Sequence, residues 1–167
     1  YRFRPDGSAL EQVAAGACNT WGCEIAPDGE IFFSTATCGE PILHVVLPEK
    51  IISRAGVPGV RAVKPIMEAN KVFPARHETR QPYLQIDWVG AWTAAAGATI
   101  YDGGAWPAPW QGPSWSFFLH EPTVWLMHHE FLDPAGVSYQ GRREASRKDT
   151  HFLTSTDYWF KPIHSRV

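Results

Sequence analysis

Short apolar runs alternate with glycine and proline turns along this chain, and few stretches have the period of a helix. Residues 95–112 are representative. The apolar run Thr99-Ile-Tyr101 leads into Gly103-Gly104, and a loop with Trp106-Pro107 and Trp110-Gln-Gly112 follows. A second apolar run, at residues 115–119, comes directly after this loop. Strands joined by glycine and proline turns predict an all-β structure.

The tripeptide Pro-Asp-Gly occurs twice in the first part of the chain, as Pro5-Asp-Gly7 and Pro27-Asp-Gly29. Proline presets φ, and glycine supplies a position with positive φ, so each copy predicts a tight hairpin turn between two apolar runs. A looser third copy lies at residues 132–136, between the runs 126–131 and 137–139. Repeated antiparallel hairpins of short strands indicate blades of a β-propeller rather than a sandwich.

The pattern divides the chain into three parts but does not indicate more than one domain. Residues 1–47 predict a first four-stranded blade, ending with the run 41–46. Residues 48–82 predict an insertion or a long crossing loop, with one short helix near residues 66–70. Strands of later blades resume at residues 84–88 and continue to the end. We therefore expect a partial propeller of about two to two and a half blades, completed by the remainder of a larger protein or by another chain.

Composition and charge exclude several functional classes. The net charge is −2 and the basic residues are scattered, which argues against a nucleic-acid-binding surface. The most basic stretch, residues 142–148, contains Glu144 and predicts a solvated loop. No apolar run approaches the roughly 20 residues of a membrane helix. The start shows no export signal, but such a signal would be removed on export or lie upstream, so the residues leave localisation open.

The cysteines Cys18, Cys23 and Cys38 are too few for a disulfide framework. Cys18 and Cys23 lack the spacing of a zinc site and lack the histidine of a covalent haem site, so we expect no covalent haem. Two readings stay open at this point: one disulfide among the three, or buried free thiols.

Several motifs in order resemble the soluble glucose/sorbosone dehydrogenase propellers. They are Tyr1-Arg-Phe-Arg-Pro-Asp-Gly-Ser8, Asn19-Thr-Trp-Gly22, Pro27-Asp-Gly-Glu-Ile-Phe-Phe33, Thr99-Ile-Tyr101 with Gly97 and Gly103, Trp106-Pro107, and Trp110-Gln-Gly112. Phe152-Leu-Thr-Ser-Thr-Asp-Tyr-Trp-Phe-Lys-Pro162 is similar to one branch, the putative membrane-bound dehydrogenase domain that is often fused to a CxxCH haem module. The resemblance implies a six-bladed propeller, export to the periplasm or the extracellular space, and pyrroloquinoline quinone (PQQ) with calcium.

Two departures from the quinone-binding relatives concern cations. Those relatives place a lysine after the Trp-Gly loop and an Arg-x-Arg pair near the final blade, where this chain has His120-Glu121 and Trp159-Phe-Lys161. A tricarboxylate needs several cations, so Lys161 alone is a poor substitute. Most of the basic ligands for the quinone are therefore missing.

Histidines in two neighbouring strands are the first candidates for chemistry. His120 ends one predicted strand, and His128-His129-Glu130 lies in its hairpin partner. Successive side chains of a strand point to opposite faces, so only one of the paired histidines shares a face with His120. A cross-strand histidine pair, with Glu121 or Glu130 nearby, would bind a metal or move a proton. His120 is the catalytic candidate, and His128 and Glu130 are the candidate metal ligands. The alternative is polar side chains satisfied by backbone or water.

The other candidates follow from loop positions. His77 and Arg80 end the predicted insertion and would enter the central funnel of a propeller; the alternative is a surface loop. Asp102 would ligate a cation, although a turn-capping role is the alternative. Trp106 and Trp110 would stack on a ring, or instead pack between blades.

Two functions are therefore expected from the sequence. One is an exported dehydrogenase of sugars or alcohols that passes electrons to a cytochrome. The other is a non-catalytic propeller that acts as a binding or scaffolding subunit of a larger membrane or electron-transfer complex, associated with a membrane through its partners.

Overall fold

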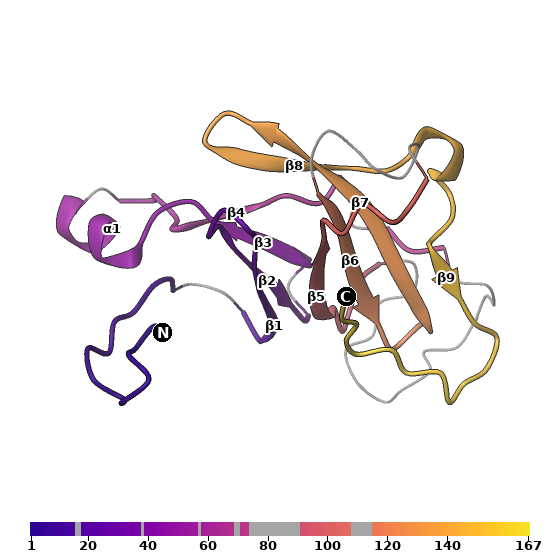
Figure 1. The fold of residues 1–167 in the computed structure, drawn as a ribbon, viewed down its shortest axis with the longest axis horizontal. Helices are drawn as coiled ribbons and strands as arrows, with labels where there is room; N and C mark the ends of the chain where they lie inside the picture. The colour runs from indigo at the N-terminus through magenta and orange to yellow at the C-terminus, as the bar shows by residue number, and fades with distance from the viewer. Residues whose placement is uncertain (16–17, 38, 57, 69–70, 74–90, 108–114) are drawn as a thin grey trace.

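Two antiparallel sheets make up the computed structural model, which describes residues 1–15, 18–37, 39–56, 58–68, 71–73, 91–107 and 115–167 (Figure 1). The first sheet has the order β1-β2-β3-β4, and the second has the order β5-β6-β7-β8 with β9 also paired to β7. Their elements are β1 (Thr20–Ile25), β2 (Ile31–Thr35), β3 (Ile42–Val45), α1 (Glu49–Ala55), β4 (Val63–Pro65), β5 (Ala96–Tyr101), β6 (Ser116–Glu121), β7 (Leu126–Ala135), β8 (Ser138–Arg142), the 3₁₀ helix η2 (Ala145–Arg147) and β9 (Leu153–Thr154).

Turn residues fix the hairpins. Pro27-Asp-Gly29 joins β1 to β2, with Gly29 at a φ of 91°, which only glycine adopts readily. Gly136 has a φ of 68° at the turn between β7 and β8. The turn at Pro5-Asp-Gly7 leads into a single β-bridge between Arg2 and Glu11 rather than a full strand pair.

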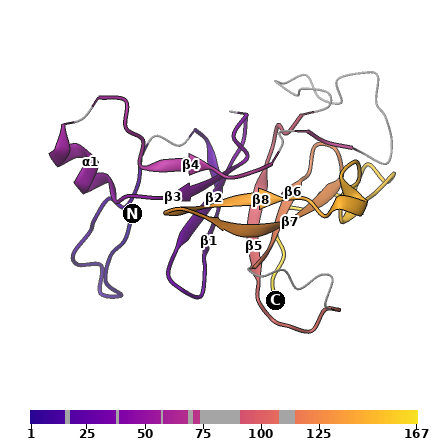
Figure 2. The same ribbon diagram turned by 90° about the horizontal axis from the view of Figure 1, so that it is seen from above.

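The two sheets pack face to face, and their first strands β1 and β5 lie side by side in both ribbon views (Figures 1 and 2). Gly22 of β1 permits this approach. A Cβ there would lie 2.8 Å from the backbone nitrogen of Ala98 and 2.9 Å from the Cα of Gly97, both in β5. The sheets therefore meet backbone to backbone at their first strands.

The main core fills the space between the sheets. Phe32, Ile42, Phe117 and Leu119 are buried in it, together with smaller residues of β5. Each buried side chain of this size contributes roughly 1.5–3 kcal/mol through removal of apolar area from water. A second cluster, centred on Phe33 and other residues of the opposite face of the first sheet, packs against α1 and the N-terminal segment.

Polar contacts also cross between the sheets. The buried His44 of β3 lies with Nδ1 2.9 Å from the Ser138 hydroxyl of β8, and with Nε2 2.7 Å from a Glu30 oxygen. The Tyr139 hydroxyl donates to Asp28 over 3.0 Å. These bonds fix the outer strand β8 against the first sheet.

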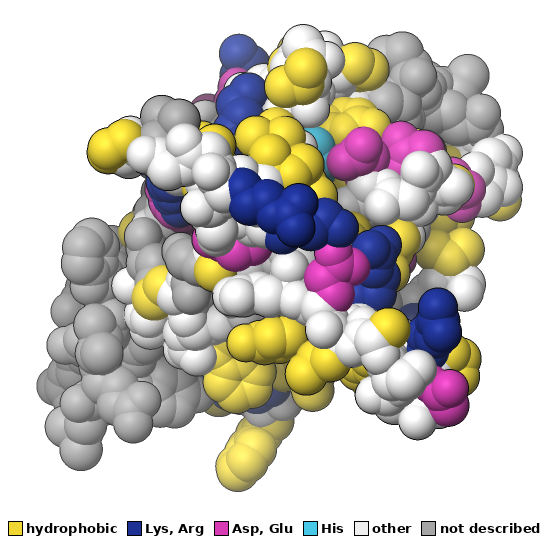
Figure 3. All heavy atoms as spheres, turned by 90° about the vertical axis from the view of Figure 1, so that its left-hand side faces the viewer, with side chains coloured by type: hydrophobic (Ala, Val, Ile, Leu, Met, Phe, Trp, Pro, Cys, Tyr) yellow, Lys and Arg dark blue, Asp and Glu magenta, His cyan; other side chains and the backbone are white. Residues whose placement is uncertain are grey.

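The side of the molecule that carries α1 shows hydrophobic side chains at its surface, beside charged ones (Figure 3). Tyr1, Leu10 and Ile51 are among the exposed apolar residues. Within the described residues, no helix has the length and apolar character needed to cross a bilayer.

The prediction of an all-β structure is confirmed, since α1 and η2 are the helical elements of the described residues. The first sheet takes its fourth strand from β4, inside the stretch expected as an insertion, rather than from the N-terminal segment. The helix expected near residues 66–70 is not formed at residues 66–68, and α1 begins instead at Glu49. Residues 69–70 and the strand expected at 84–88 lie outside the described residues. A closed propeller stays a prediction.

Candidate functional site

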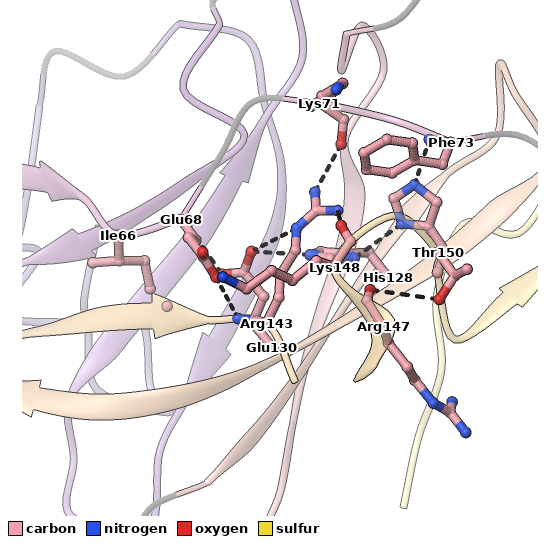
Figure 4. A network of polar contacts seen from close by, with 12 residues as sticks. Ile66, Glu68, Lys71, Phe73, His128, Glu130, Arg143, Arg147, Lys148 and Thr150 are labelled. Carbon is pink, nitrogen blue, oxygen red and sulfur yellow. Dashed lines mark hydrogen bonds and ion pairs between the residues drawn. The ribbon is translucent and has the colours of Figure 1, made fainter. Parts of the chain in front are cut away.

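The strongest candidate site is a buried polar cluster between the sheets, at the outer end of the second sheet (Figure 4). Strand β7 supplies His128 and Glu130, which share a face because they are two residues apart. His128 lies opposite Leu119, a residue of the core between the sheets, so this face points toward the first sheet. His128 is 2% exposed and Glu130 is 3% exposed.

A directed chain of hydrogen bonds runs through two histidines to Glu130. The Phe73 backbone N–H donates to Nε2 of His151 over 2.7 Å, so this nitrogen must be an acceptor. The Nδ1 atom of His151 then carries the hydrogen and donates to Nδ1 of His128 over 3.0 Å. The Nε2 atom of His128 in turn donates to Glu130 over 3.0 Å. The Phe73 N–H thereby fixes both histidines as neutral rings, with the hydrogen on Nδ1 of His151 and on Nε2 of His128.

Arg143 and Glu68 complete the cluster. Arg143 follows β8 and donates through its guanidinium to the carbonyl oxygens of Lys71 (2.8 Å) and Lys148 (3.0 Å). Its Nε lies 3.7 Å from Oε1 of Glu130. The Arg143 backbone N–H donates to Glu68 over 2.6 Å, and the Glu68 N–H donates to Glu130 over 3.3 Å. The cluster thus connects the segment after β4 to the second sheet.

Gly141 of β8 makes room for the Glu130 carboxylate. A Cβ at this position would overlap a carboxylate oxygen of Glu130 and would lie 2.8 Å from the Ile66 carbonyl oxygen. The Gly141 N–H donates to that same carbonyl. A glycine here is therefore required by close packing.

Burial dominates the electrostatics of the cluster. It lowers the pKa of His151 to about 2, with help from His128, and holds the pKa of His128 well below its usual value. It also raises the pKa of Glu130 to about 8, against the opposing effects of the Glu68 N–H and Arg143. Burial likewise lowers the pKa of Arg143. Neutral histidines are what the hydrogen-bond chain requires.

Chemically, this cluster holds protons in fixed positions within a closed interior. Among the described residues there is no group of three or more His, Cys, Asp or Glu side chains that would hold a metal ion. His128 and Glu130 do lie together, as expected, but Asp102 does not join them. The hydrogen bonds of the cluster connect strand β7 to the segment after β4 and to residue 151.

His120 faces the opposite side of the second sheet from His128, because it pairs with Met127. It is 1% exposed, and its Nδ1 donates to the Gly97 carbonyl over 3.0 Å. Burial lowers its pKa. The neighbouring Glu121 is buried and accepts hydrogen bonds from the backbone N–H groups of Thr93, Ala94 and Thr123 at 2.9–3.1 Å. Both side chains are therefore bonded to backbone groups of the protein.

Trp106 lies inside an aromatic group on the outer face of the second sheet. It stacks on Tyr101, with ring centroids 4.7 Å apart, and on Phe152, with centroids 5.5 Å apart and planes 6° from parallel. Phe118 meets it edge-on at 5.2 Å. Trp106 is thus packed against rings of the second sheet and of residue 152. Asp102 is exposed in the loop after β5.

The Lys161 ammonium donates to the Pro122 carbonyl over 3.0 Å and lies 5.2 Å from the centre of the Trp125 ring. The structure thus places this candidate cofactor ligand against a turn of the second sheet. His77, Arg80 and Trp110, the other candidates from the sequence, lie outside the described residues.

Sequence reasoning missed His151, Glu68 and the burial of Arg143. The stretch around Arg143 was expected to be a solvated loop, but the Arg143 side chain is 4% exposed. The only sequence signal was its place directly after the strand that pairs with β7. Its partners are contributed by Lys71 and by residues beyond η2, and local patterns cannot report such distant contacts.

Comparison with known proteins gives one family. No curated protein and no solved structure matches the chain. The family described as Domain of unknown function (DUF7133) matches residues 1–167, which is the full length of the chain. The chain therefore belongs to the DUF7133 family.

Proposed function

We propose that this chain supplies two neighbouring blades of a glucose/sorbosone dehydrogenase-type β-propeller, and that its described residues form scaffold rather than reacting groups. The main support is the packing of two antiparallel meanders, β1–β4 and β5–β8, with their first strands side by side. Propeller blades are four-stranded sheets arranged radially, so first strands of neighbouring blades lie next to each other around the channel.

The bonding of the candidate residues supports a scaffolding role. His120 donates to the Gly97 carbonyl, and Lys161 donates to the Pro122 carbonyl. His128 and Glu130 take part in the cluster between the sheets. A general acid or base must reach substrate, whereas these groups are satisfied by protein atoms.

A disulfide supports the exported location that the resemblance implies. Cys18 is disulfide-bonded, and Cys23 is a free, exposed thiol. Disulfides persist mainly in oxidising compartments such as the periplasm or the extracellular space. Cys38, one of the three cysteines among which a disulfide was considered, lies outside the described residues. The expected partners are the remainder of the propeller or another chain, which would provide any membrane association.

A second candidate is the oxidoreductase itself, oxidising a sugar or alcohol and passing electrons to a cytochrome. Its support is the stacking of Trp106 on Phe152, because these residues belong to two separate motifs that resemble the dehydrogenase family. The described residues do not fit PQQ with calcium, because Lys161 is already bonded and no acidic or histidine cluster of three is present among them. We therefore derive no step through this cofactor.

One titration separates the two candidates. PQQ is added to the intact protein with and without calcium while tryptophan fluorescence is recorded, and dye-linked oxidation of glucose and ethanol is assayed in parallel. The scaffold predicts no saturable quenching and no dye reduction, with Lys161→Met behaving as the unmodified protein. Stoichiometric quinone binding together with dye reduction would reject the scaffold and favour the oxidoreductase.

A further inference from the structure

The outer face of the second sheet, which points away from the first sheet, is partly covered by the C-terminal segment, residues 163–167. Thr99 lies on this face, because it pairs with Phe118 while its neighbour Ala98 is buried in the core between the sheets. The Thr99 hydroxyl donates to the Ser165 carbonyl over 2.9 Å, and the Ser165 hydroxyl donates back to the Thr99 oxygen over 3.0 Å. The segment is thus bonded to β5.

Residues 163–164 approach β5 as closely as β1 does. A Cβ at Gly97 would overlap the carbonyl oxygen of Ile163, and would lie 2.8 Å from the Cα of His164. Gly22 of β1 meets the same Gly97 from the first sheet. The backbones of β1, β5 and residues 163–164 therefore come together at Gly97. Residues 163–164 approach β5 from the outer face in the same way as β1 approaches it from the first sheet.

A hollow of about 240 Å³ lies beside this segment. Tyr101, Trp106, Phe118, Met127 and Phe152 contribute its apolar lining, and Thr99 and residues 165–167 form the rest. Apolar side chains around it are exposed, including Leu153 (43%) and Val167 (78%). An apolar hollow beside exposed apolar side chains indicates a site of packing against another element.

We propose that a third antiparallel β-sheet of the same protein covers this outer face, with residues 163–167 as its first strand. This inference rests on the proposed propeller fold and specifies it. The third sheet packs on the second as the second packs on the first, with first strands in contact at Gly97. Its remaining strands then bury the aromatic hollow, as the strands of the first sheet bury Phe117 and Leu119.

Cysteine accessibility in the full-length protein tests the covering sheet. Leu153 is the reporter, because it pairs with Met127 and so lies on the outer face. Val137, which is 85% exposed at the turn before β8, is the control. Leu153→Cys and Val137→Cys are each made in a Cys23→Ser background, and maleimide labelling rates are compared in the native state and in urea.

The proposal predicts that Leu153→Cys reacts at least about 100-fold more slowly than Val137→Cys in the native protein, and equally fast in urea, since burial restricts reagent access. Protection should not depend on protein concentration. Equal native rates would overturn the proposal. Protection that disappears on dilution would also overturn it, because the cover would then be a second copy. Neither result bears on quinone binding, so failure here is distinct from failure of the scaffold proposal.

Discussion

The Nδ1 atoms of His128 and His151 face each other at 3.0 Å, so one ring must donate and the other must accept. The Phe73 N–H settles which ring does so, because it requires an acceptor at Nε2 of His151. Three segments distant in sequence are therefore tied by a hydrogen-bond chain that tolerates only neutral histidines.

Replacing His151 should weaken the acid sensitivity of the fold. Its pKa is lowered to about 2, so as pH falls from about 6.5 to 4 only the unfolded state takes up this proton. That difference removes about 1.4 kcal/mol of stability per pH unit. In His151→Leu, the slope of unfolding free energy against pH should fall by this amount. Stability at pH 7.5 should also drop by about 1–3 kcal/mol, because the Phe73 N–H loses its acceptor.

Urea unfolding at several pH values checks this prediction. His164→Gln is the matched control, because it removes an exposed histidine that lies outside the cluster. An unchanged slope in His151→Leu would show that this histidine is not held neutral.

Replacing Glu130 should change how the free energy of unfolding falls as pH rises toward 8. Burial raises the pKa of Glu130 to about 8, so its stabilising contribution is complete below its unfolded pKa and is lost as pH rises through about 8. Between pH 6.5 and 8 this group should therefore lower the free energy of unfolding by up to about 1.4 kcal/mol per pH unit. Glu130→Gln should flatten this decline, whereas Glu49→Gln on α1 should not. If the free energy of unfolding fell equally with pH in Glu130→Gln and in the unmodified protein, the raised pKa of Glu130 would be contradicted.

A methyl group at Gly141 should displace the Glu130 carboxylate. We expect Gly141→Ala to cost at least about 3 kcal/mol in unfolding free energy, because overpacking is combined with lost hydrogen bonds. Gly136→Ala is the control for backbone strain alone, since its φ is 68° and its Cβ would meet nothing within 4 Å. That variant should cost about 1–2 kcal/mol. Chemical denaturation of both variants measures these losses. A larger loss in Gly136→Ala than in Gly141→Ala would contradict the packing argument.

The two described cysteines should respond differently to serine. Cys18 is disulfide-bonded, so Cys18→Ser should cost about 2–5 kcal/mol. Cys23 is an exposed free thiol, and Cys23→Ser should change stability by less than about 0.5 kcal/mol. Thermal unfolding with and without reductant gives the comparison. Reductant should lower the stability of the unmodified protein to that of Cys18→Ser. Equal stability of the two variants without reductant would contradict the disulfide.

The local pattern predicted a good part of the second sheet. The apolar run at 115–119, the histidine-containing strand and the turn before residue 137 correspond to β6, β7 and β8, because alternation and turn residues act over a few positions. The same local logic failed for β4, a strand of three residues at Val63–Pro65. Its apolar pattern is too short to stand out, and pairing with β3 is what makes it a strand.

The sequence by itself determined the all-β class, the hairpin at Pro27-Asp-Gly29 and the opposite faces of His128 and His129, since φ restriction and strand period are local properties. Only the tertiary structure decided that His128 meets His151 and that Arg143 is buried. Those outcomes depend on how the segment after β4 docks on the second sheet. Desolvation by that docking sets the protonation of the cluster, and no pattern of neighbouring residues encodes it.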